Sequence, residues 1–286
     1  MIDFLNKILN KSLGWTDSNP IYRSVGGGCI NDTAHIKTNR GEYFVKWNHG
    51  MLDMFEKEKK GLELLAEGAS LNTPKTLGVG EIDGKGYLLM EYIEGGRMNT
   101  EFWEKLGTGL AALHRNTNER FGLDHDNYIG RLPQSNTRAK SWIDFFIAQR
   151  MQPQIKLAFD GQRIESTQVA RFDLLFSKLS SLIPEERPAL LHGDLWSGNI
   201  HCDRSSEPYL IDPAVFYGHR EAELAFTSLF GGFDSQFYQS YQESFPLHRG
   251  FESRVDLFNM YPLMVHVNLF GTSYLSGVDA VLRRYA

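Results

Sequence analysis

One segment constrains the fold of this chain more than any other: residues 190–213, in which two apolar stretches each run directly into an aspartate. The first stretch, LLHGD, ends at Asp194, and Asn199 follows five positions later. The second stretch, YLID, ends at Asp212. Short apolar runs that end in polar residues are typical of buried strands. The sequence therefore predicts a strand-rich site around Asp194, Asn199 and Asp212.

These residue types suit the transfer of a phosphoryl group from a nucleotide. One carboxylate can accept the proton of the attacking hydroxyl, while an amide oxygen and a second carboxylate hold Mg²⁺ against the phosphates. The spacing also matches the kinase pattern H-R-D-x-x-x-x-N at every position but the second. We therefore predict Asp194 as the catalytic base and Asn199 and Asp212 as Mg²⁺ ligands. Either aspartate alone would fit a turn after a strand, and it is the joint spacing that favours a site.

The two residues before Asp194 narrow the class of kinase. His192 is expected to brace the loop through backbone hydrogen bonds, with a reactive role as the alternative. Gly193 stands where protein kinases carry an arginine that meets a phosphorylated activation loop. No A-P-E sequence follows Asp212 either. A protein kinase is therefore the least favoured class, and a small-molecule kinase is favoured.

The N-terminal third offers the groups that would hold ATP. Lys46 lies in an apolar strand and is predicted to meet the phosphates, held by Glu58 of the next helix. Glu56 is the alternative partner, and an unpaired surface lysine is the structural alternative. The glycines Gly26, Gly27 and Gly28 would let backbone N–H groups approach phosphates, although a plain turn fits as well. Cys29 beside them is either a redox-sensitive residue or an inert small one.

The segment LMEYIEG is expected to form a hinge that binds adenine. Backbone groups of Glu91, Tyr92 and Ile93 would hydrogen-bond the adenine edge, and Met90 would pack behind it. An ordinary strand end is the alternative. ATP and Mg²⁺ are thus the predicted cofactors.

The order of elements predicts an α+β, bilobal, protein-kinase-like fold. A nucleotide-binding lobe over residues 1–92 would combine a leading amphipathic helix, a small antiparallel sheet and one further helix. A mainly helical lobe over 93–286 would carry the catalytic loop and the substrate site. The expected strands cover 21–25, 33–38, 42–47, 76–80 and 86–92. The expected helices after the first cover 53–68, 100–115, 138–160, 165–182, 220–230, 234–245 and 251–280.

Composition excludes several classes of protein. The net charge is −5 and there is no basic run, so no nucleic-acid partner is expected. The sequence has no stretch of 18 apolar residues and no signal-peptide pattern, so no membrane partner is expected either. With only two cysteines, a reducing compartment and hence the cytoplasm is the predicted location. The sequence does not distinguish a monomer from a dimer.

Several segments resemble those of the fructosamine kinase (ketosamine-3-kinase) family. They are GGGCIND at 26–32, FEKE at 55–58, LHR at 113–115, FGLDHDNYIG at 121–130, HGDLWSGN at 192–199, IDPA at 211–214, GHREAELA at 218–225 and HVNLFG at 266–271. The HGDxxxxN pattern is shared with aminoglycoside phosphotransferases and choline kinases, whereas the WSG, GGGCIN and FGLDHDNYIG segments are more specific. The resemblance implies ATP-dependent phosphorylation of the 3-hydroxyl of a free or protein-bound ketoamine, which serves deglycation repair.

Substrate contacts are the least determined part of the site. Trp196, His219, Arg220 and His266 are candidates, with Asn268 as a further one; a core role for Trp196 and a bracing role for His219 and Arg220 are the alternatives. Two rival functions are a kinase for another hydroxylated amine, such as an aminoglycoside or choline, and a nucleotide-binding module without catalysis. The joint presence of Lys46, Asp194, Asn199 and Asp212 argues against the module.

Overall fold

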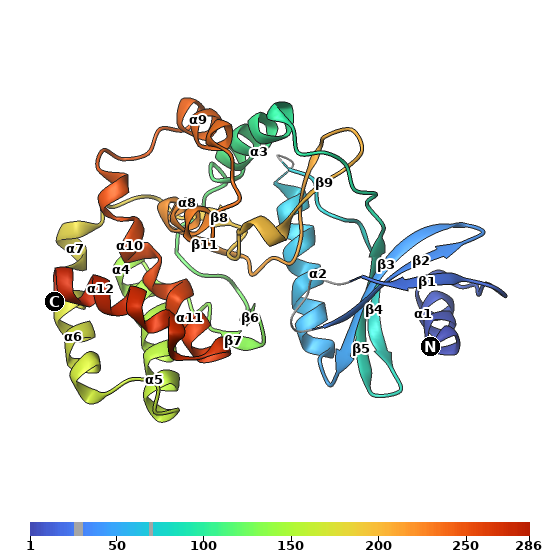
Figure 1. Cartoon of the computed structure of the whole chain (residues 1–286), viewed down its shortest axis with the longest axis horizontal. Coiled ribbons are helices and arrows are strands. Elements are labelled where there is room, and N and C mark those ends of the chain that lie inside the picture. Colours follow the sequence, from blue (N-terminus) through green and yellow to red (C-terminus); the bar gives the residue numbers. More distant parts are fainter. Residues whose placement is uncertain (26–30, 69–70) are drawn as a thin grey trace.

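The computed structural model describes residues 1–25, 31–68 and 71–286. The predicted loop of Gly26, Gly27 and Gly28, together with Cys29, lies outside the described residues. Figure 1 shows a sheet with two helices at the N-terminal end of the chain and a larger, mainly helical part beyond it. This arrangement confirms the predicted α+β, kinase-like fold.

The N-terminal sheet has five antiparallel strands in the order β1-β2-β3-β5-β4. They are β1 (Ile21–Ser24), β2 (Asp32–Thr38), β3 (Gly41–His49), β4 (Thr76–Ile82) and β5 (Lys85–Glu91). Each lies within a few residues of its predicted range. Strands β2 and β3 form a hairpin around Asn39 and Arg40, because Thr38 pairs with Gly41.

Two helices cover opposite faces of this sheet. Helix α1 (Ile2–Leu13) packs Leu5, Ile8 and Leu9 against Tyr87 and Leu89 of β5, among others. Helix α2 (Leu52–Glu67) packs Met54, Phe55 and Leu62 against Leu88 and Met90 of the same strand. Successive side chains of a strand point to opposite faces. Lys46, which pairs with Leu88, therefore faces α2.

The segment that contains Asp194 and Asp212 is built from short strand pairs outside the N-terminal sheet. Strand β8 (Ala189–Leu191) pairs with β11 (Phe216–Gly218), and β9 (Ile200–Cys202) pairs with β10 (Pro208–Leu210). A hairpin of β6 (Asn127–Ile129) and β7 (Leu132–Gln134) lies beside α2 (Figure 1). Strand β11 and this hairpin were not predicted, because three-residue strands leave almost no periodic signal in a sequence.

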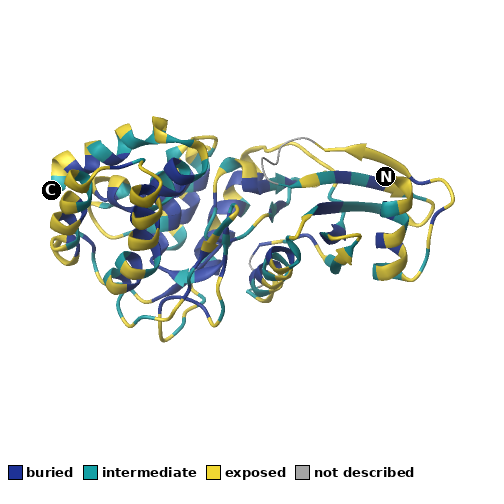
Figure 2. Ribbon diagram, turned by 90° about the horizontal axis from the view of Figure 1, so that it is seen from below, coloured by how far each residue is buried: buried dark blue, intermediate teal, exposed yellow. Residues whose placement is uncertain are grey.

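The helices of the C-terminal part are shorter than predicted. The expected helix 138–160 begins only at Trp142 and contains a π-helical turn, and the expected helix 251–280 breaks at Gly271, whose φ of +106° ends a helix. The helices of this part are α3 (Thr100–Leu113), α4 (Trp142–Phe145), the π turn Phe146–Met151, α5 (Gln152–Asp160), α6 (Ser166–Phe176), α7 (Leu179–Leu182), α8 (Arg220–Leu229), α9 (Ser235–Ser244), α10 (Val255–Phe258), α11 (Met260–Phe270) and α12 (Leu275–Tyr285). Buried residues of α4–α7 and α10–α12 form one hydrophobic cluster, whereas those of α3 and α9 belong to a second. Figure 2 shows the buried residues in the interior of the helical part.

Candidate active site

Lys46 is buried between two carboxylates. Its Nζ lies 2.7 Å from Oε1 of Glu58 on α2, and it also contacts Oδ1 of Asp212. Burial alone would lower the pKa of Lys46, but the charges of Asp212 and Glu58 outweigh burial and raise it. The lysine therefore stays charged. Glu58, and not Glu56, is the partner in the structure, and Asp212 is brought to the same point from the other side.

The backbone around Asp194 requires a glycine before it. Gly193 has φ of +83°, and a Cβ at this position would lie 2.0 Å from the carbonyl oxygen of Ala214. No arginine fits there without moving the neighbouring segment. The departure from the protein-kinase pattern at residue 193 is thus a consequence of the tight packing between the Asp194 loop and the segment after Asp212.

Asn199 joins the two aspartates. Its Nδ2 donates to the backbone oxygen of Asp194 at 2.8 Å, to Oδ2 of Asp194 at 3.0 Å and to the backbone oxygen of Asp212 at 3.5 Å. Asp212 itself has φ of +55°, a left-handed conformation that is uncommon for a residue with a side chain. The residues predicted from the 190–213 segment therefore converge at one place.

His192 holds the loop from inside the protein. Its Nε2 lies 2.9 Å from the carbonyl oxygen of Ile211, and its Nδ1 accepts from the N–H of Asp194 at 3.3 Å. Burial lowers the pKa of His192, so the ring is neutral and can donate at Nε2 while it accepts at Nδ1. The contacts match the bracing role and leave no ring nitrogen for chemistry.

Glu223 on α8 is a residue that sequence reasoning missed. Its carboxylate accepts from the N–H of His192 at 3.1 Å and from the N–H of Gly193 at 2.7 Å, and it lies 2.9 Å from Nε2 of His114. Burial would raise the pKa of Glu223, but these hydrogen bonds and the charge of His114 lower it. A charged residue inside the apolar stretch EAELAF was the available signal. Glu223 thus fixes the backbone that carries Asp194.

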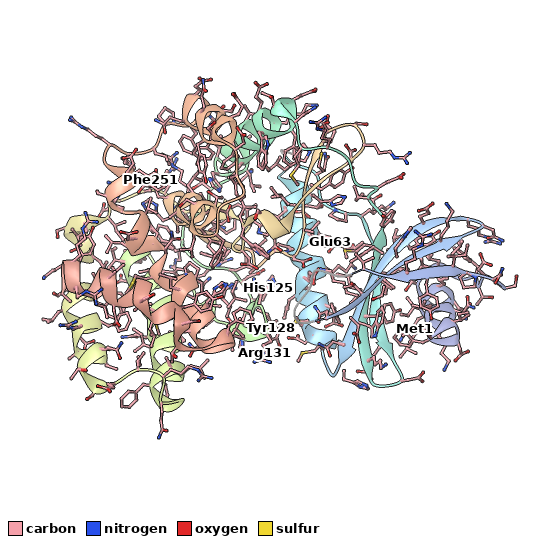
Figure 3. All side chains as sticks on the ribbon, viewed as in Figure 1. Met1, Glu63, His125, Tyr128, Arg131 and Phe251 are labelled. Atoms are coloured by element: carbon pink, nitrogen blue, oxygen red, sulfur yellow. The ribbon has the colours of Figure 1, made fainter. Side chains whose placement is uncertain are left out.

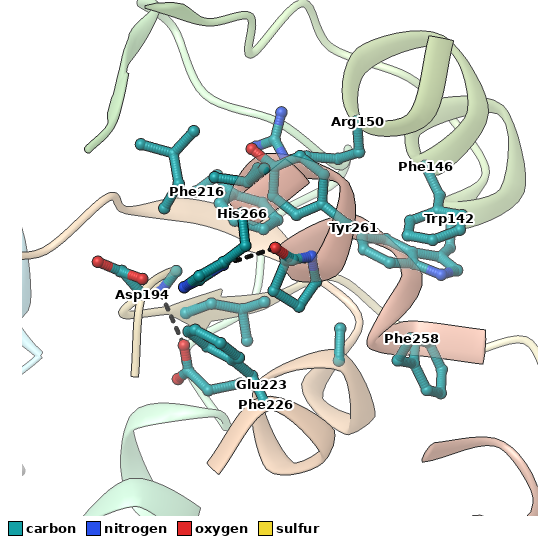
Figure 4. A pocket seen from close by; sticks show the side chains of 16 residues that line it. Trp142, Phe146, Arg150, Asp194, Phe216, Glu223, Phe226, Phe258, Tyr261 and His266 are labelled. Atoms are coloured by element: carbon teal, nitrogen blue, oxygen red, sulfur yellow. Dashed lines mark hydrogen bonds between the residues drawn. The ribbon is translucent and has the colours of Figure 1, made fainter. Parts of the chain in front are cut away.

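An aromatic pocket opens beside Asp194 and runs toward the C-terminal core (Figure 4). Its free volume is about 50 Å³, room for only a few atoms or water molecules. The lining residues are Ile129, Trp142, Phe146, Arg150, Leu191, Gly193, Asp194, Phe216, Ala222, Glu223, Phe226, Phe258, Tyr261, Pro262, Val265 and His266. Asp194 and Glu223 are thus the acidic side chains of a largely apolar wall.

This wall changes the chemistry of Asp194. Burial raises the pKa of its carboxyl to about 7; the hydrogen bond from Asn199 opposes the rise, and the charges of Asp212 and Glu223 add to it. A base that titrates near neutrality can accept a proton from a hydroxyl far better than an ordinary carboxylate. Such a perturbed carboxylate in a pocket is a mark of a functional site.

Arg150 is a second residue that the sequence did not reveal. It lies on the π-helical turn, and its guanidinium sits 4.0 Å from the ring centre of Phe216 and 4.5 Å from that of Phe145. It donates to the carbonyl oxygen of Ser135 and, at 2.7 Å, to Oδ1 of Asn136. Burial lowers the pKa of Arg150 to about 10. The arginine therefore contributes a positive charge at the pocket wall.

The predicted hinge is partly engaged within the protein. Met90 is buried in the cluster beneath α2. The N–H of Glu91 donates to the carbonyl oxygen of Lys75 at 3.0 Å, and the N–H of Tyr92 donates to the carbonyl oxygen of Glu42 at 3.4 Å. The carbonyl oxygen of Ile93 lies 3.1 Å from Nε2 of His201. These bonds fix the path of the segment between the sheet and the helical part.

His266 and Trp196 stay close to solvent-accessible parts of the site. His266 lines the pocket, and its Nδ1 lies 2.7 Å from the carbonyl oxygen of Pro262, which leaves Nε2 as an acceptor (Figure 4). Trp196 is 37% exposed, and its ring covers Gly198 so closely that a Cβ there would lie 2.3 Å from it. Both remain substrate candidates.

The contacts of His219 and Arg220 in the structure fit the bracing role and not a contact with substrate. His219 is fully buried and caps α8: Nδ1 accepts from the N–H of Glu221, and Nε2 lies 3.1 Å from the carbonyl oxygen of Pro184. Arg220 donates to Glu186 at 2.7 Å and to two backbone oxygens of residues 245–246. Both residues brace α8 and neither lines the pocket. Asn268 is likewise turned away, toward Gln154.

The donor set fits a magnesium ion that is shared with phosphates. Within the described residues, no group of three or more His, Cys, Asp or Glu side chains could hold a metal ion by itself. Mg²⁺ in nucleotide sites is usually held by one or two protein oxygens together with phosphates and water. The carboxylate of Asp212 and the amide oxygen of Asn199, whose Nδ2 is committed to Asp194, supply that kind of set.

Comparison with known proteins identifies the family that this chain matches. The family model for fructosamine kinase matches residues 1–286. Mouse ketosamine-3-kinase is 35% identical, with 98% of this chain and 99% of that protein covered. The chloroplastic protein-ribulosamine 3-kinase of Arabidopsis thaliana is 39% identical over 92% of this chain and 81% of its own length. The resemblance noted in the sequence is thereby confirmed.

Solved structures share the architecture. A Haemophilus somnus protein assigned to the fructosamine-3-kinases superposes with a TM-score of 0.88 at 26% identity, over 98% of this chain and 96% of that one. The complex of the aminoglycoside phosphotransferase APH(4)-Ia with AMP-PNP and hygromycin B superposes with a TM-score of 0.65 at 17% identity, over 99% and 98% of the chains. At that identity the likeness concerns the fold alone.

Proposed function

From the premise that this chain belongs to the fructosamine kinase family, we propose that it transfers the γ-phosphoryl group of ATP to the 3-hydroxyl of a ketoamine. The observation that carries the proposal is the convergence of Asp194, Asn199 and Asp212 opposite Lys46. The proposed proton acceptor, metal ligands and phosphate-binding cation thus lie close together, which is what in-line transfer requires.

Lys46 and Glu58 form the phosphate-binding part of the proposed site. Lys46 is held in place by Glu58 and Asp212, so its charge is already directed when the nucleotide arrives. Adenine would bind at the 90–93 segment, where we assign the N–H of Ile93 as the donor to the ring. The triphosphate would then run from the hinge past Lys46 toward Asp212.

Asn199 and Asp212 would hold Mg²⁺, which neutralises charge on the β- and γ-phosphates when bound. Asp194 orients the acceptor hydroxyl and takes its proton as the oxygen attacks phosphorus. The new O–P bond forms while the bond between phosphorus and the β,γ-bridging oxygen breaks, and ADP leaves. The rate then comes chiefly from positioning and from charge stabilisation.

The acceptor would lie between Asp194, Trp196 and His266. The small free volume of the pocket leaves room only for part of a sugar. We propose that the sugar end of the acceptor enters the pocket and that its amine-bearing end points outward. An outward amine suits a substrate attached to a protein as well as a free one. We therefore propose fructosamines and ribulosamines, free or protein-bound, as the substrate class, with deglycation repair as the outcome.

ATP consumption across a panel of acceptors tests this function. The panel contains fructosyllysine, ribulosyllysine, kanamycin and choline, and phosphate position is read by NMR of the product. We expect turnover of the two ketoamines with phosphate on O3. Turnover of kanamycin or choline alone would favour the rival kinase. Nucleotide binding without turnover of any acceptor would favour the non-catalytic module.

The cellular setting stays a prediction. No helix among the described residues has the length and apolar character needed to cross a membrane. We propose the cytoplasm as the location and either a monomer or a dimer as the working form, which fractionation and size-exclusion chromatography with light scattering would test.

A further inference from the structure

The hairpin of β6 and β7 lies between the acceptor pocket and α2, and the proposed mechanism does not use it. Successive residues of β6 point in opposite directions. Asn127 and Ile129 are buried on the side of the helical part, whereas Tyr128 points toward the N-terminal sheet and α2. Figure 3 labels Tyr128 at this boundary. One short strand therefore has contacts on both sides of the cleft.

On the side of the helical part, β6 is tied to the pocket wall. Ile129 lines the pocket directly. The side chain of Asn127 donates to the carbonyl oxygen of Val215 at 2.8 Å and accepts from Gln134 at 2.8 Å. Gln134 in turn accepts from the hydroxyl of Tyr261, a pocket residue, at 2.6 Å. The position of the hairpin and that of the wall are thus linked by buried hydrogen bonds.

On the other side, Tyr128 holds the first turn of α2. Its hydroxyl donates to Oδ2 of Asp53 at 2.9 Å, and its ring packs against the cluster that contains Met54 and Phe55. Two turns further along, Gly61 lets α2 approach the C-terminal part so closely that a Cβ there would lie 3.2 Å from Pro213. Glu58 lies between these two fixed points and carries the partner oxygen of Lys46.

We infer that Tyr128 is a positioning residue that couples the acceptor pocket to the nucleotide site. An acceptor that fills the pocket restrains Tyr261 and Ile129, and these two residues restrain the hairpin. The hairpin in turn fixes the position of α2 and therefore of the Lys46–Glu58 pair. Each substrate then increases the affinity for the other, and the gain depends on the hydrogen bond from Tyr128 to Asp53. The inference rests on the proposed function, because it takes the two sites to be those of ATP and the ketoamine.

The test measures the dissociation constant of Mg·AMP-PNP with and without saturating fructosyllysine. In the wild-type chain we expect at least about a fivefold tightening, the lower end of common coupling strengths. Tyr128→Phe keeps the ring and loses the hydroxyl, so the tightening should fall below about twofold. The reciprocal titration of fructosyllysine must give the same factors, because coupling is mutual.

Variants of Asp53 and a distant tyrosine complete the design. Asp53→Asn keeps an acceptor oxygen for Tyr128 and should retain the coupling, whereas Asp53→Ala should lose it; Tyr128→Phe combined with Asp53→Ala should be no worse than either alone. Tyr285→Phe removes a comparable exposed hydrogen bond, to Ser253, and should leave the coupling unchanged.

Two results would overturn the inference: wild-type coupling that persists in folded Tyr128→Phe, or no coupling in the wild-type chain. These results are separable from a failure of the proposed function, because wild-type turnover of fructosyllysine is measured first. An absence of turnover removes the function and the inference together, while turnover without Tyr128-dependent coupling removes the inference alone.

Discussion

Asp212 and Asp194 both follow short apolar stretches, yet their surroundings differ. Asp212 faces the sheet and is paired with buried Lys46, so the nucleotide side of the cleft consists of opposite charges already in contact. Asp194 faces an aromatic pocket, and burial raises its pKa to about 7. The contrast shows that an aspartate stays ionised beside a cationic side chain but can serve as a proton acceptor near neutral pH when apolar side chains surround it.

The largest expected effect separates the two aspartates. Asp194→Asn removes the proton acceptor but keeps its size, so kcat should fall by about 10³-fold or more while Mg·ADP affinity changes little. Lys46→Met should weaken both turnover and nucleotide affinity. Steady-state ADP release and nucleotide titration measure the two quantities. An Asp194→Asn variant with normal kcat would contradict the role of Asp194 as proton acceptor.

The same substitution carries a stability signature. The folded chain keeps a proton on Asp194 up to about pH 7, whereas the unfolded chain releases it near pH 4, so the folded state loses stability as pH rises between these values. Asp194→Asn should therefore melt at a higher temperature than the wild-type chain at pH 8, and this difference should shrink as the pH is lowered. Thermal unfolding at several pH values provides the measurement.

A second prediction concerns the support of the acceptor side. Glu223→Gln keeps one acceptor oxygen but places an amide NH2 group against one of the two backbone N–H donors, so the Asp194 loop should shift and kcat should fall by about 10²-fold. The free energy of unfolding should fall by about 3 kcal/mol, because a buried network loses a charged acceptor. Urea unfolding and turnover per folded molecule are the readouts.

Glu221→Gln is the matched control for this prediction. Glu221 lies on the same helix and is equally buried, but it pairs with Arg254 at 2.7 Å and not with the loop. It should lose comparable stability and keep kcat within a few-fold. Equal losses of kcat in both variants would show that instability, and not loop position, governs turnover.

The two sides of the cleft also differ in how well the sequence predicted them. Lys46, Glu58, Asn199 and Asp212 could be predicted as a group because their spacing reflects a general requirement of phosphate and metal binding, and the structure brings them together. The sheet and its helices were found because alternation and helical periodicity are strong over long elements. Both kinds of signal are local in the sequence.

The acceptor side gave weaker signals because it is assembled from distant segments. Glu223, Arg150 and Tyr261 reach the pocket only through the packing of α8, the π-helical turn and α11. Conversely, His219 and Arg220 follow Asp212 closely in the sequence but turn away from it to brace α8. Closeness to Asp212 in the sequence does not predict closeness in space here, because the three-residue strand β11 lies between and the chain changes direction there.

The pH profile sharpens the contrast with a smaller effect. Asp194 must be ionised to accept a proton, so kcat/KM should rise about tenfold per pH unit below 7 and level off above it. His266→Gln should keep this pH profile, and that result would exclude titration of the pocket histidine as the cause of the profile. A rate that is flat between pH 5.5 and 8, with chemistry limiting, would contradict the raised pKa of Asp194.

The smallest expected effect tests whether His266 belongs to the acceptor side alone. With Nδ1 committed to Pro262, Nε2 is left to accept a hydrogen bond from a sugar hydroxyl, a contact that contributes about 1 kcal/mol. His266→Ala should therefore raise the KM for fructosyllysine by about five- to tenfold and leave the KM for ATP unchanged, whereas His266→Gln, which keeps an acceptor, should recover part of the loss. Steady-state kinetics with each substrate varied in turn gives both constants. An equal rise in both KM values would mean that His266 contributes to the binding of ATP as well as of fructosyllysine. The two aspartates would then differ in protonation but would not belong to separate binding sites.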